Sequence, residues 1–394
     1  MKQLYNGLIL KDGKWEKDAS VIVDGNKIIA IADNELPIVG AERINAHGCY
    51  IVPGGIEQHC HGGGGRDFME GTVEAFRVAI DAHMQHGTTS IFPTLSSSTM
   101  PMIYDAVEAT EELMKEENSP VLGLHLEGHY LNMDMAGGQI PENIKNPDPE
   151  EYIPLLNGTS CIKRWSTAPE LPGTEEFGRF CAAHDVLNAV AHTKANYSEV
   201  KAAYDIGFTH ANHFYNAMRG FHKNREYKYE GTVESVLEIQ NMTVEMIADG
   251  IHVPPVMLRM VYQIKGVERT SLITDSLAVA ASKSMRAFDP RVIIEDGVCK
   301  LSDRSALAGS IATMDRLVRT AVQQAHIPMA DACRMISETP AKIMKVYNRK
   351  GSLEKGKDAD IIMFDQGQQL KFVMAMGRVV RNDLETETFE EDPK

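Results

Sequence analysis

The sequence is poor in cysteine and has no long apolar run. Its six cysteines form no CxxC pair, and so few thiols in 394 residues do not make a disulfide framework. We therefore expect reduced thiols and a cytoplasmic protein. No apolar stretch approaches the ~18 residues that a membrane-spanning helix requires. Met1-Lys2-Gln3 runs directly into an alternating strand pattern, without the basic and then apolar segments of a signal peptide.

Positive charge is also scarce. The chain has 40 Lys and Arg against 55 Asp and Glu, which gives a net charge of −15. So acidic a protein is unsuited to general nucleic-acid binding and to anionic membrane surfaces. An anionic substrate would require a local basic pocket. The apolar fraction of 43%, with 31 Gly and 17 Pro, is typical of a globular protein and excludes the disordered and fibrous classes.

Both ends of the chain have the pattern of β structure. Short apolar segments are separated by turn signals such as Asp24-Gly25-Asn26. These segments are residues 4–10, 20–23, 27–32, 359–364 and 372–380. We predict that residues 1–52 and 346–385 form one small β-sandwich domain, followed by a solvated acidic tail at 386–394.

The middle of the chain, residues 53–345, alternates apolar runs with helical patterns. The eight runs are residues 50–56, 88–93, 121–126, 162–168, 187–191, 207–209, 244–248 and 271–274. Helical periodicity is found at residues 73–86, 102–116, 174–184, 198–206, 256–266, 312–325 and 329–337. Eight such units predict an α/β fold of the (β/α)8 TIM-barrel type. A doubly wound sheet is the alternative, and the lack of a GxGxxG motif weakens it.

Histidines and carboxylates follow the ends of five of these runs. They are His59, His61, Glu127, His192, His210, His213 and Asp275. Each alone has an ordinary explanation, such as a helix cap or a hydrogen-bonded core histidine. In a barrel, however, all of them would meet at the carboxyl-terminal mouth, where active sites of this fold are built. Together they predict a site for Zn²⁺ or Fe²⁺.

Several motifs carry a resemblance to a known family. They are PGGIEQHCHG at 53–62, HLEG at 125–128, AHT at 191–193, HANHFYNAM at 210–218, ADGIHV at 248–253 and LAGS at 307–310. With these motifs the chain resembles the amidohydrolase superfamily and, within it, the N-acetylglucosamine-6-phosphate deacetylases. The resemblance covers residues 4 to 380. It implies metal-dependent removal of acetate from an amino-sugar phosphate.

The resemblance also implies roles for individual residues. Glu127, His192 and His213 match the main metal ligands, and His59 and His61 match the pair that lets some members hold a second ion. Asp275 matches the catalytic acid and base, acting on a metal-activated water. The matched substrate contacts are Gly138, Gln139, Asn216, Ala217, Arg225, His252, Leu307, Ala308 and Gly309. The resemblance further implies zinc, or else iron, at one or two ions per subunit, and a homodimer in which Arg225 reaches the neighbouring site.

Two departures from the family pattern concern the substrate. His129 stands where the family usually has proline, and Gln139 stands where it has a histidine that touches the substrate near its scissile amide. Gln139 can donate a hydrogen bond but cannot become a cation, and His129 either substitutes for the missing histidine or packs in the core. The substrate is therefore expected to be N-acetylglucosamine 6-phosphate. The alternative substrates are N-acetylgalactosamine 6-phosphate and that of another amidohydrolase. The alternative to an enzyme is a non-catalytic binding barrel.

Overall fold

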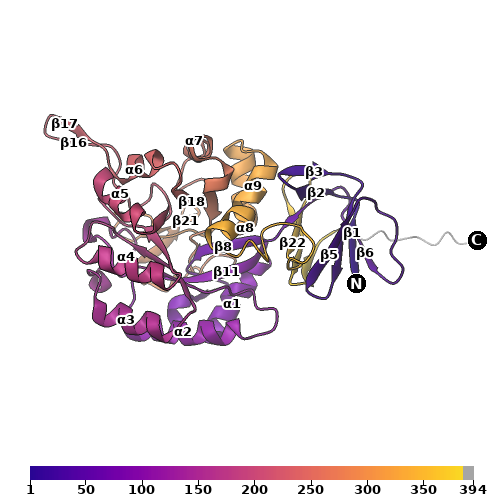
Figure 1. Ribbon diagram of the computed structural model, residues 1–394, viewed down its shortest axis with the longest axis horizontal. Helices are drawn as coiled ribbons and strands as arrows, with labels where there is room; N and C mark the ends of the chain where they lie inside the picture. Colours follow the sequence, from indigo (N-terminus) through magenta and orange to yellow (C-terminus); the bar gives the residue numbers. More distant parts are fainter. Residues whose placement is uncertain (385–394) are drawn as a thin grey trace, which may run out of the picture.

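The computed structural model describes residues 1–384 and divides the molecule into two lobes (Figure 1). A large lobe of alternating strands and helices holds the middle of the chain, and a smaller lobe of strands holds both ends. Residue 385 and the predicted acidic tail at 386–394 lie outside the described residues. Among residues 1–384, no helix is both long and apolar enough to cross a membrane. All six cysteines are buried and unpaired.

The large lobe is built on one sheet of eight strands, in the order β19-β18-β15-β14-β13-β12-β11-β8. Their bounds are β8 Gly55–Cys60, β11 Thr88–Leu95, β12 Leu124–Glu127, β13 Ile162–Thr167, β14 Leu187–Val190, β15 Phe208–Ala211, β18 Thr243–Ile247 and β19 Thr270–Ile273. All neighbours in this sheet are parallel. The N–H of Asp275 donates to His59 O at 3.0 Å and so joins the last strand to the first. The predicted barrel is confirmed.

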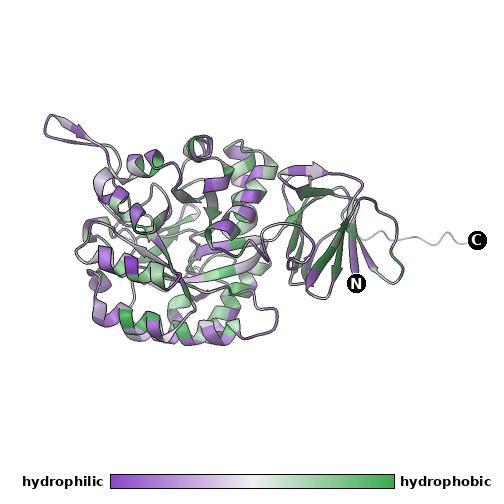
Figure 2. Cartoon of the chain, in the orientation of Figure 1, coloured by the Kyte–Doolittle hydropathy of each residue, from purple (hydrophilic) through white to green (hydrophobic). Residues whose placement is uncertain are grey.

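Helices cover the outside of the barrel (Figure 1). They are α1 Val73–Met84, α2 Met100–Met114, α3 Pro149–Gly158, α4 Thr174–Ala183, α5 Tyr197–Asp205, α6 Thr232–Glu238, α7 Pro255–Lys265, α8 Met314–Arg319, α9 Met329–Ile336 and α10 Glu338–Ile343. The helices visible in Figure 2 carry both hydrophobic and hydrophilic residues. In α1, for example, Thr72 caps the amino terminus, and Phe76, Ala79 and Ile80 are buried. The sequence analysis missed α3, α6 and α10.

The small lobe consists of two sheets that pack face to face. One has the order β24-β23-β22-β7-β2-β3 and the other β5-β4-β1-β6. Their bounds are β1 Lys2–Tyr5, β2 Leu8–Lys11, β3 Lys14–Glu16, β4 Ser20–Asp24, β5 Lys27–Ala32, β6 Glu42–Asn45, β7 Tyr50–Pro53, β22 Ile361–Phe364, β23 Leu370–Ala375 and β24 Arg378–Asn382. A shared apolar core includes Leu4, Val21, Ile361 and Phe372. The predicted β-sandwich from both termini is therefore present, while its exact limits stay a prediction.

Two apolar runs that we treated as single strands are each divided between two sheets. Residues 50–56 contain the end-to-end strands β7, in the small lobe, and the start of β8, in the barrel. Residues 4–10 contain the end of β1 and most of β2, which belong to different sheets. Asn6-Gly7 and Pro53-Gly54 mark the two breaks in the sequence, and the sequence analysis did not use these turn signals. Gly54 permits the break between β7 and β8: a Cβ there would lie 2.1 Å from Thr89 Oγ1.

Two hairpins that the sequence analysis did not identify extend from the barrel. β16 (His222–Asn224) and β17 (Tyr227–Tyr229) project away from the rest of the molecule (Figure 1). β20 (Val292–Glu295) and β21 (Val298–Leu301) form the second hairpin. The second hairpin contributes to the wall of the site described next.

Candidate active site

A cavity of about 380 Å³ opens where the barrel strands end. Five of the predicted chemical residues line it, namely His61, Glu127, His192, His213 and Asp275. Eight predicted substrate contacts also line it, namely Gly138, Gln139, Asn216, Ala217, His252, Leu307, Ala308 and Gly309. His59 is fully buried behind them. The barrel thus brings together residues that lie far apart in the sequence.

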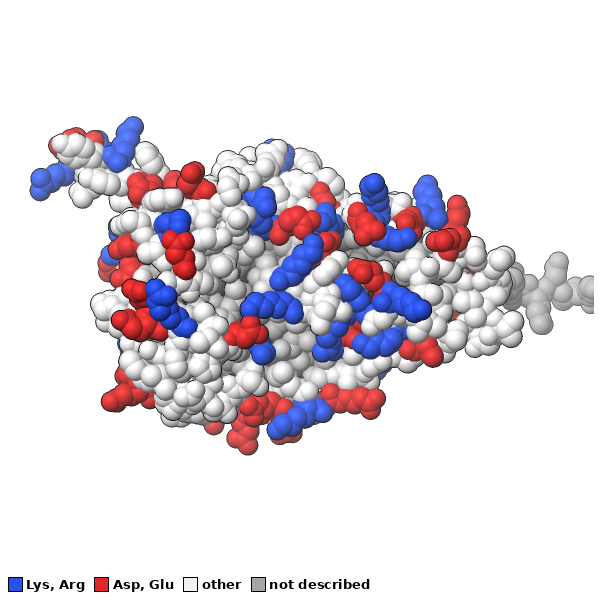
Figure 3. Space-filling model, in the orientation of Figure 1, with Lys and Arg blue, Asp and Glu red and all other residues white. Residues whose placement is uncertain are grey.

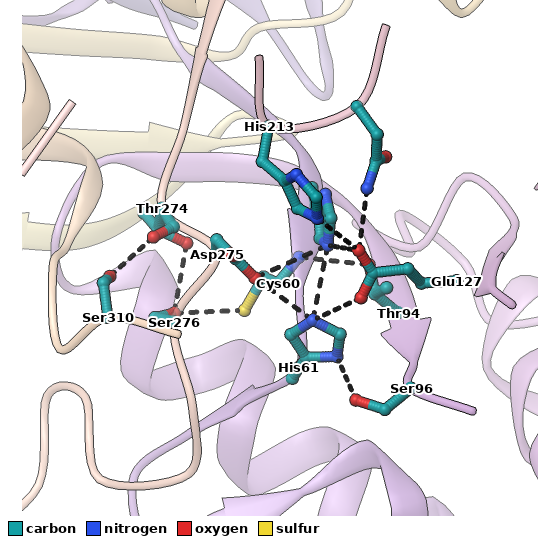
Figure 4. A network of polar contacts seen from close by, with 12 residues as sticks. Cys60, His61, Thr94, Ser96, Glu127, His213, Thr274, Asp275, Ser276 and Ser310 are labelled. Carbon is teal, nitrogen blue, oxygen red and sulfur yellow. Dashed lines mark hydrogen bonds and ion pairs between the residues drawn. The ribbon is translucent and has the colours of Figure 1, made fainter. Parts of the chain in front are cut away.

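The potential metal ligands form two adjoining groups. Glu127, His192 and His213 make up the first group, and His59, His61 and Asp275 the second. In the first, Glu127 Oε1 lies 2.8 Å from His213 Nε2 and 3.3 Å from His192 Nε2. In the second, His61 Nε2 lies 3.1 Å from Asp275 Oδ1 and 3.3 Å from His59 Nε2. Glu127 joins the groups, since its Oε2 lies 3.3 Å from His61 Nε2 (Figure 4).

The four imidazoles are held with Nε2 toward the centre. His192 Nδ1 donates to Met135 O at 2.8 Å, and His213 Nδ1 donates to Asn216 O at 3.1 Å. His61 Nδ1 lies 3.1 Å from Ser96 Oγ. Such contacts on the outer ring nitrogen fix the orientation and tautomer of metal-binding histidines. They leave the lone pairs of the Nε2 atoms directed at one another, an arrangement that a cation between them stabilises.

The electrostatics of the two groups also favour cations. Burial lowers the pKa of His61, but hydrogen bonds with Asp275 and Glu127 outweigh burial and raise it to about 10. Burial raises the pKa of Glu127, but the charge of His59 and hydrogen bonds from His192 and His213 hold it well below its usual range. Positive charge is therefore favoured at this point. Imidazole nitrogens and carboxylate oxygens are suitable ligands for a divalent ion, and two groups suit one or two ions.

Asp275 lies in the turn after β19, with its carboxylate beside both His59 and His61. Burial raises its pKa, but the charge of His59 and the hydrogen bond and charge of His61 lower it by more than burial raises it. The net shift is downward, so the side chain is ionised near neutral pH. An ionised carboxylate at the floor of a cavity can accept a proton from water. The position agrees with the acid–base role that the resemblance implies.

Gln139 faces the ligands, whereas His129 does not. Gln139 Nε2 donates to Glu127 Oε2 at 2.7 Å, and its Oε1 accepts from the N–H of Ser97 at 2.7 Å. His129 is buried against the rings of Tyr130 and Trp165, and its Nε2 lies 3.2 Å from Glu151 Oε2. His129 does not line the cavity. Of the two interpretations of His129, packing in the core is therefore the one that fits its position.

The loop that carries Gln139 is attached to the β20–β21 hairpin. Arg291 Nη2 donates to Gln139 O at 3.1 Å, and the same guanidinium pairs with Asp289 at 2.6 Å. Ala308, on the same side of the cavity, approaches so closely that a Cβ on Gly138 would lie 2.9 Å from its Cβ. The close approach of Ala308, in the segment after this hairpin, thus requires glycine at position 138.

Arg225 is the one predicted substrate contact that the structure places away from the cavity. It stands at the turn of the β16–β17 hairpin, exposed, with φ of 55°. Lys and Arg side chains are visible at the far end of this hairpin (Figure 3). Among the described residues, no Lys or Arg lines the cavity itself. A phosphate bound in the cavity would therefore contact no lysine or arginine among the described residues of its own subunit.

The sequence analysis overlooked a buried polar network beneath the ligands. It contains Gln58, Arg164, His210, Asn212 and Glu245, and all five are fully buried. His210, which we placed at the mouth, lies within β15 with Nε2 3.3 Å from Glu245 Oε2. The available signal was a charged residue inside each of two predicted barrel strands, Arg164 in β13 and Glu245 in β18.

Comparison with known proteins agrees with this site. The model of the amidohydrolase family matches residues 50–381. The chain belongs to the amidohydrolase family. An N-acetylglucosamine-6-phosphate deacetylase of Haemophilus influenzae is 30% identical over 371 residues, which cover 93% of this chain and 96% of the relative. An N-acetylgalactosamine-6-phosphate deacetylase of a Shewanella species is 27% identical, over 84% of this chain and 83% of the relative.

Solved structures of this amidohydrolase group have the same fold. The N-acetylglucosamine-6-phosphate deacetylase of Pasteurella multocida has a TM-score of 0.91 and 28% identity, over 97% of this chain and 100% of that one. A mutant deacetylase of Mycobacterium smegmatis, in complex with N-acetyl-D-glucosamine-6-phosphate, has a TM-score of 0.89 and 28% identity, over 97% and 99% of the two chains. The resemblance seen in the sequence is confirmed.

Proposed function

We propose that this amidohydrolase hydrolyses N-acetylglucosamine 6-phosphate to glucosamine 6-phosphate and acetate. The observation that carries the proposal is the convergence of four imidazoles and two carboxylates on a cavity whose walls contain eight of the nine expected substrate contacts. The relatives of the chain support the substrate class. A non-catalytic barrel is disfavoured because such a protein has no reason to keep all six ligand side chains.

Glu127, His192 and His213 would hold one ion, and His59, His61 and Asp275 a second. When bound, a divalent ion, zinc or else iron, lowers the pKa of water and polarises an amide carbonyl. We assign to Asp275 the removal of a proton from the attacking water and its delivery to the amide nitrogen. The water oxygen then bonds to the carbonyl carbon, the C–N bond breaks, and acetate and the free sugar amine leave.

The remaining wall residues have binding roles in this proposal. Leu307, Ala308 and Gly309 would enclose the acetyl group. Asn216, Ala217 and His252 would face the phosphate end of the sugar, where Asp249 Oδ2 orients the His252 ring at 2.8 Å. Because the cavity has no Lys or Arg, we propose a homodimer in which Arg225 of one subunit supplies the missing cation to the other.

Which sugar epimer the enzyme prefers depends, in this proposal, on Gln139, which replaces the expected histidine. Its amide is occupied by Glu127 and Ser97 and so offers the substrate less than a free imidazole would. N-acetylgalactosamine 6-phosphate is the second candidate, because relatives named for both sugars match the chain. We propose a cytoplasmic location from the six buried, unpaired thiols.

A panel assay tests the proposal. Acetate release is measured with the 6-phosphates of N-acetylglucosamine and N-acetylgalactosamine, with unphosphorylated N-acetylglucosamine, and with a dipeptide and a cyclic imide. We expect the first substrate to have the highest kcat/KM. Release from the dipeptide or the imide, and from none of the sugars, would contradict the proposal.

Removal of the metal is the second arm of this test. A chelator should abolish acetate release, and Zn²⁺ or Fe²⁺ should restore it. The reason is that the proposed mechanism needs a metal ion to activate water and polarise the amide carbonyl. The metal content of the same samples is measured in parallel. Full activity in a metal-free preparation would exclude the mechanism.

A further inference from the structure

A buried ion pair lies directly behind the ligand groups. Glu245 on β18 and Arg164 on β13 are both fully buried, and the guanidinium approaches both carboxylate oxygens, at 2.6 and 2.7 Å. Removing two charges from water is costly, and such a pair is therefore weak evidence of a role in stability. Its position beneath the site indicates a different use.

The Glu245 carboxylate has no unsatisfied oxygen. Its Oε1 accepts from His59 Nδ1 at 2.7 Å and from the N–H of His213 at 3.1 Å. Its Oε2 accepts from Gln58 Nε2 at 2.9 Å and lies 3.3 Å from His210 Nε2. With Arg164 added, every lone pair has a partner, so the carboxylate is fixed in place.

The contact with His59 determines which ring nitrogen faces the site. An ionised carboxylate can only accept, so His59 Nδ1 must carry the proton. The lone pair of His59 is then on Nε2, which lies 3.3 Å from His61 Nε2 and 3.5 Å from Asp275 Oδ1. This is the tautomer that a metal ligand requires, and a carboxylate behind a histidine also makes it a stronger ligand.

The first ligand group depends on Glu245 much less. Its imidazoles, His192 and His213, have backbone carbonyls as Nδ1 partners. Glu245 contacts this group directly only through the backbone N–H of His213, which leaves the His213 ring unaffected. Glu127 meets the ion pair indirectly, through His59 and through Asn212, which donates from Nδ2 to Glu127 Oε1 at 2.7 Å. Loss of the Glu245 charge should therefore affect the two groups unequally.

We propose that Glu245, held by Arg164, is a positioning residue that prepares His59 to bind metal, so that the His59, His61 and Asp275 group takes up a second divalent ion. The inference rests on the proposed metal-dependent function and deepens it. In this inference, binding of the second ion depends on Glu245, although its carboxylate would touch neither the metal nor the substrate.

Titration of metal-free protein with Zn²⁺ tests this inference. Wild type should bind two equivalents per subunit. In Glu245→Gln the second equivalent should bind about 10–100-fold more weakly, as for other residues behind metal ligands, while the first changes little. With Co²⁺ in place of Zn²⁺, the absorption spectrum of the variant should lack the contribution of the second ion at one to two equivalents.

A matched control separates positioning from stability. Asp360→Asn removes a buried carboxylate of the small lobe that accepts from Lys350 Nζ at 2.5 Å. We expect this variant to be less stable and to keep both metal affinities. Equal weakening of both equivalents in Glu245→Gln, or two equivalents at wild-type affinity, would overturn the inference. So would a wild type that binds only one ion.

A second variant and a measurement on wild type cover a failure to fold. Glu245→Leu with Arg164→Met replaces both charges by apolar side chains, a change that proteins often tolerate. It should lose the second equivalent. In ¹⁵N NMR of metal-free wild type, His59, assigned from its absence in His59→Asn, should carry its proton on Nδ1, and a proton on Nε2 alone would overturn the inference. A wild type that binds no divalent ion and releases no acetate would instead contradict the proposed function itself, so the two failures are distinguishable.

Discussion

Two of the six potential metal ligands have backbone angles that side chains rarely adopt. Asp275 has φ of 46° and His192 has φ of 42°. Such conformations cost of order 1–3 kcal/mol and persist only where neighbouring contacts enforce them. The Asp275 peptide is held by His59 O and by Ser310 N, and His192 O accepts from Asn132 N at 3.0 Å. The strained turns direct both side chains into the mouth of the barrel.

Asp275→Asn tests the proton-transfer role at the scale of one residue. The amide has the same size and can still contact the histidines, but it cannot accept a proton from water. We expect kcat to fall by about 10²–10⁴-fold, the usual contribution of general acid–base catalysis. Steady-state kinetics and metal content are measured together. A variant that keeps a tenth of the wild-type kcat with full metal content would move the role to another residue.

At the scale of elements, Lys265 shows how a buried charge joins two helices. It is the last residue of α7, and its Nζ donates to Val236 O at 2.5 Å and to Ile239 O at 2.8 Å, at the carboxyl end of α6. A lysine at this position satisfies carbonyls that the helix leaves free. Burial, with a smaller contribution from Arg269, lowers its pKa to about 8.

This pKa predicts how stability changes with pH. Between pH 8 and about 10.5, folded Lys265 has lost its proton while the unfolded chain still binds one, so stability rises with pH in this interval. In Lys265→Met the contribution is absent. The difference in the free energy of unfolding, wild type minus variant, should therefore increase by up to about 3 kcal/mol from pH 8 to about 10.5, at about 1.4 kcal/mol per pKa unit.

Urea unfolding of both proteins at several pH values from 7.5 to 10.5 measures this difference. Tyrosines and other lysines titrate in both proteins, so their effects cancel in the comparison. Parallel curves for wild type and Lys265→Met would show that the folded-state pKa of this lysine is not lowered.

At the scale of the whole molecule, the β16–β17 hairpin projects away from its own barrel (Figure 1). Phe221, next to β16, and Tyr227 on β17 are 62% and 61% exposed. Large apolar side chains that are exposed together often mark a protein–protein contact. On α7, Val256 is 59% exposed. The homodimer proposed above rests on these exposed apolar residues, on Arg225 at the tip of the arm, and on a cavity that no Lys or Arg of the described residues lines.

Arg225→Ala tests whether that cation serves a phosphate. A charge-assisted hydrogen bond is worth about 1.5–3 kcal/mol, so KM for the phosphorylated sugar should rise about 10–150-fold. KM for the unphosphorylated sugar should barely change. Lys223→Ala, on the same hairpin, is the matched control and should leave both KM values near wild type. An equal rise in KM for both sugars would show that Arg225 does not bind the phosphate and is an ordinary surface residue.

Subunit mixing tests whether the arginine acts on the neighbouring site. A heterodimer of Arg225→Ala and Asp275→Asn subunits has one site that lacks both groups and one intact site. Activity regained on mixing two weakly active homodimers, at substrate well below KM, would show action between subunits. No recovery, in spite of demonstrated subunit exchange, would exclude it.

Most of the ligand set could be predicted from the sequence because each ligand follows an apolar run. In a parallel barrel the ends of such strands converge, so Glu127, His192 and Asp275 could be assigned to one mouth from local patterns alone. The assignment of roles came from the family motifs. The choice between His129 and Gln139 stayed open, because the direction of each side chain depends on how the loop after β12 folds over the mouth.

The sequence by itself determined the barrel and the residues at its mouth, since strand length, alternation with helices and the position of polar residues are local properties. Tertiary structure alone decided the support behind them. His59 and Glu245 are 186 positions apart, and Arg164 and Glu245 are 81 apart. Which buried charge meets which histidine depends on the curvature and register of the closed sheet, and no local pattern encodes these.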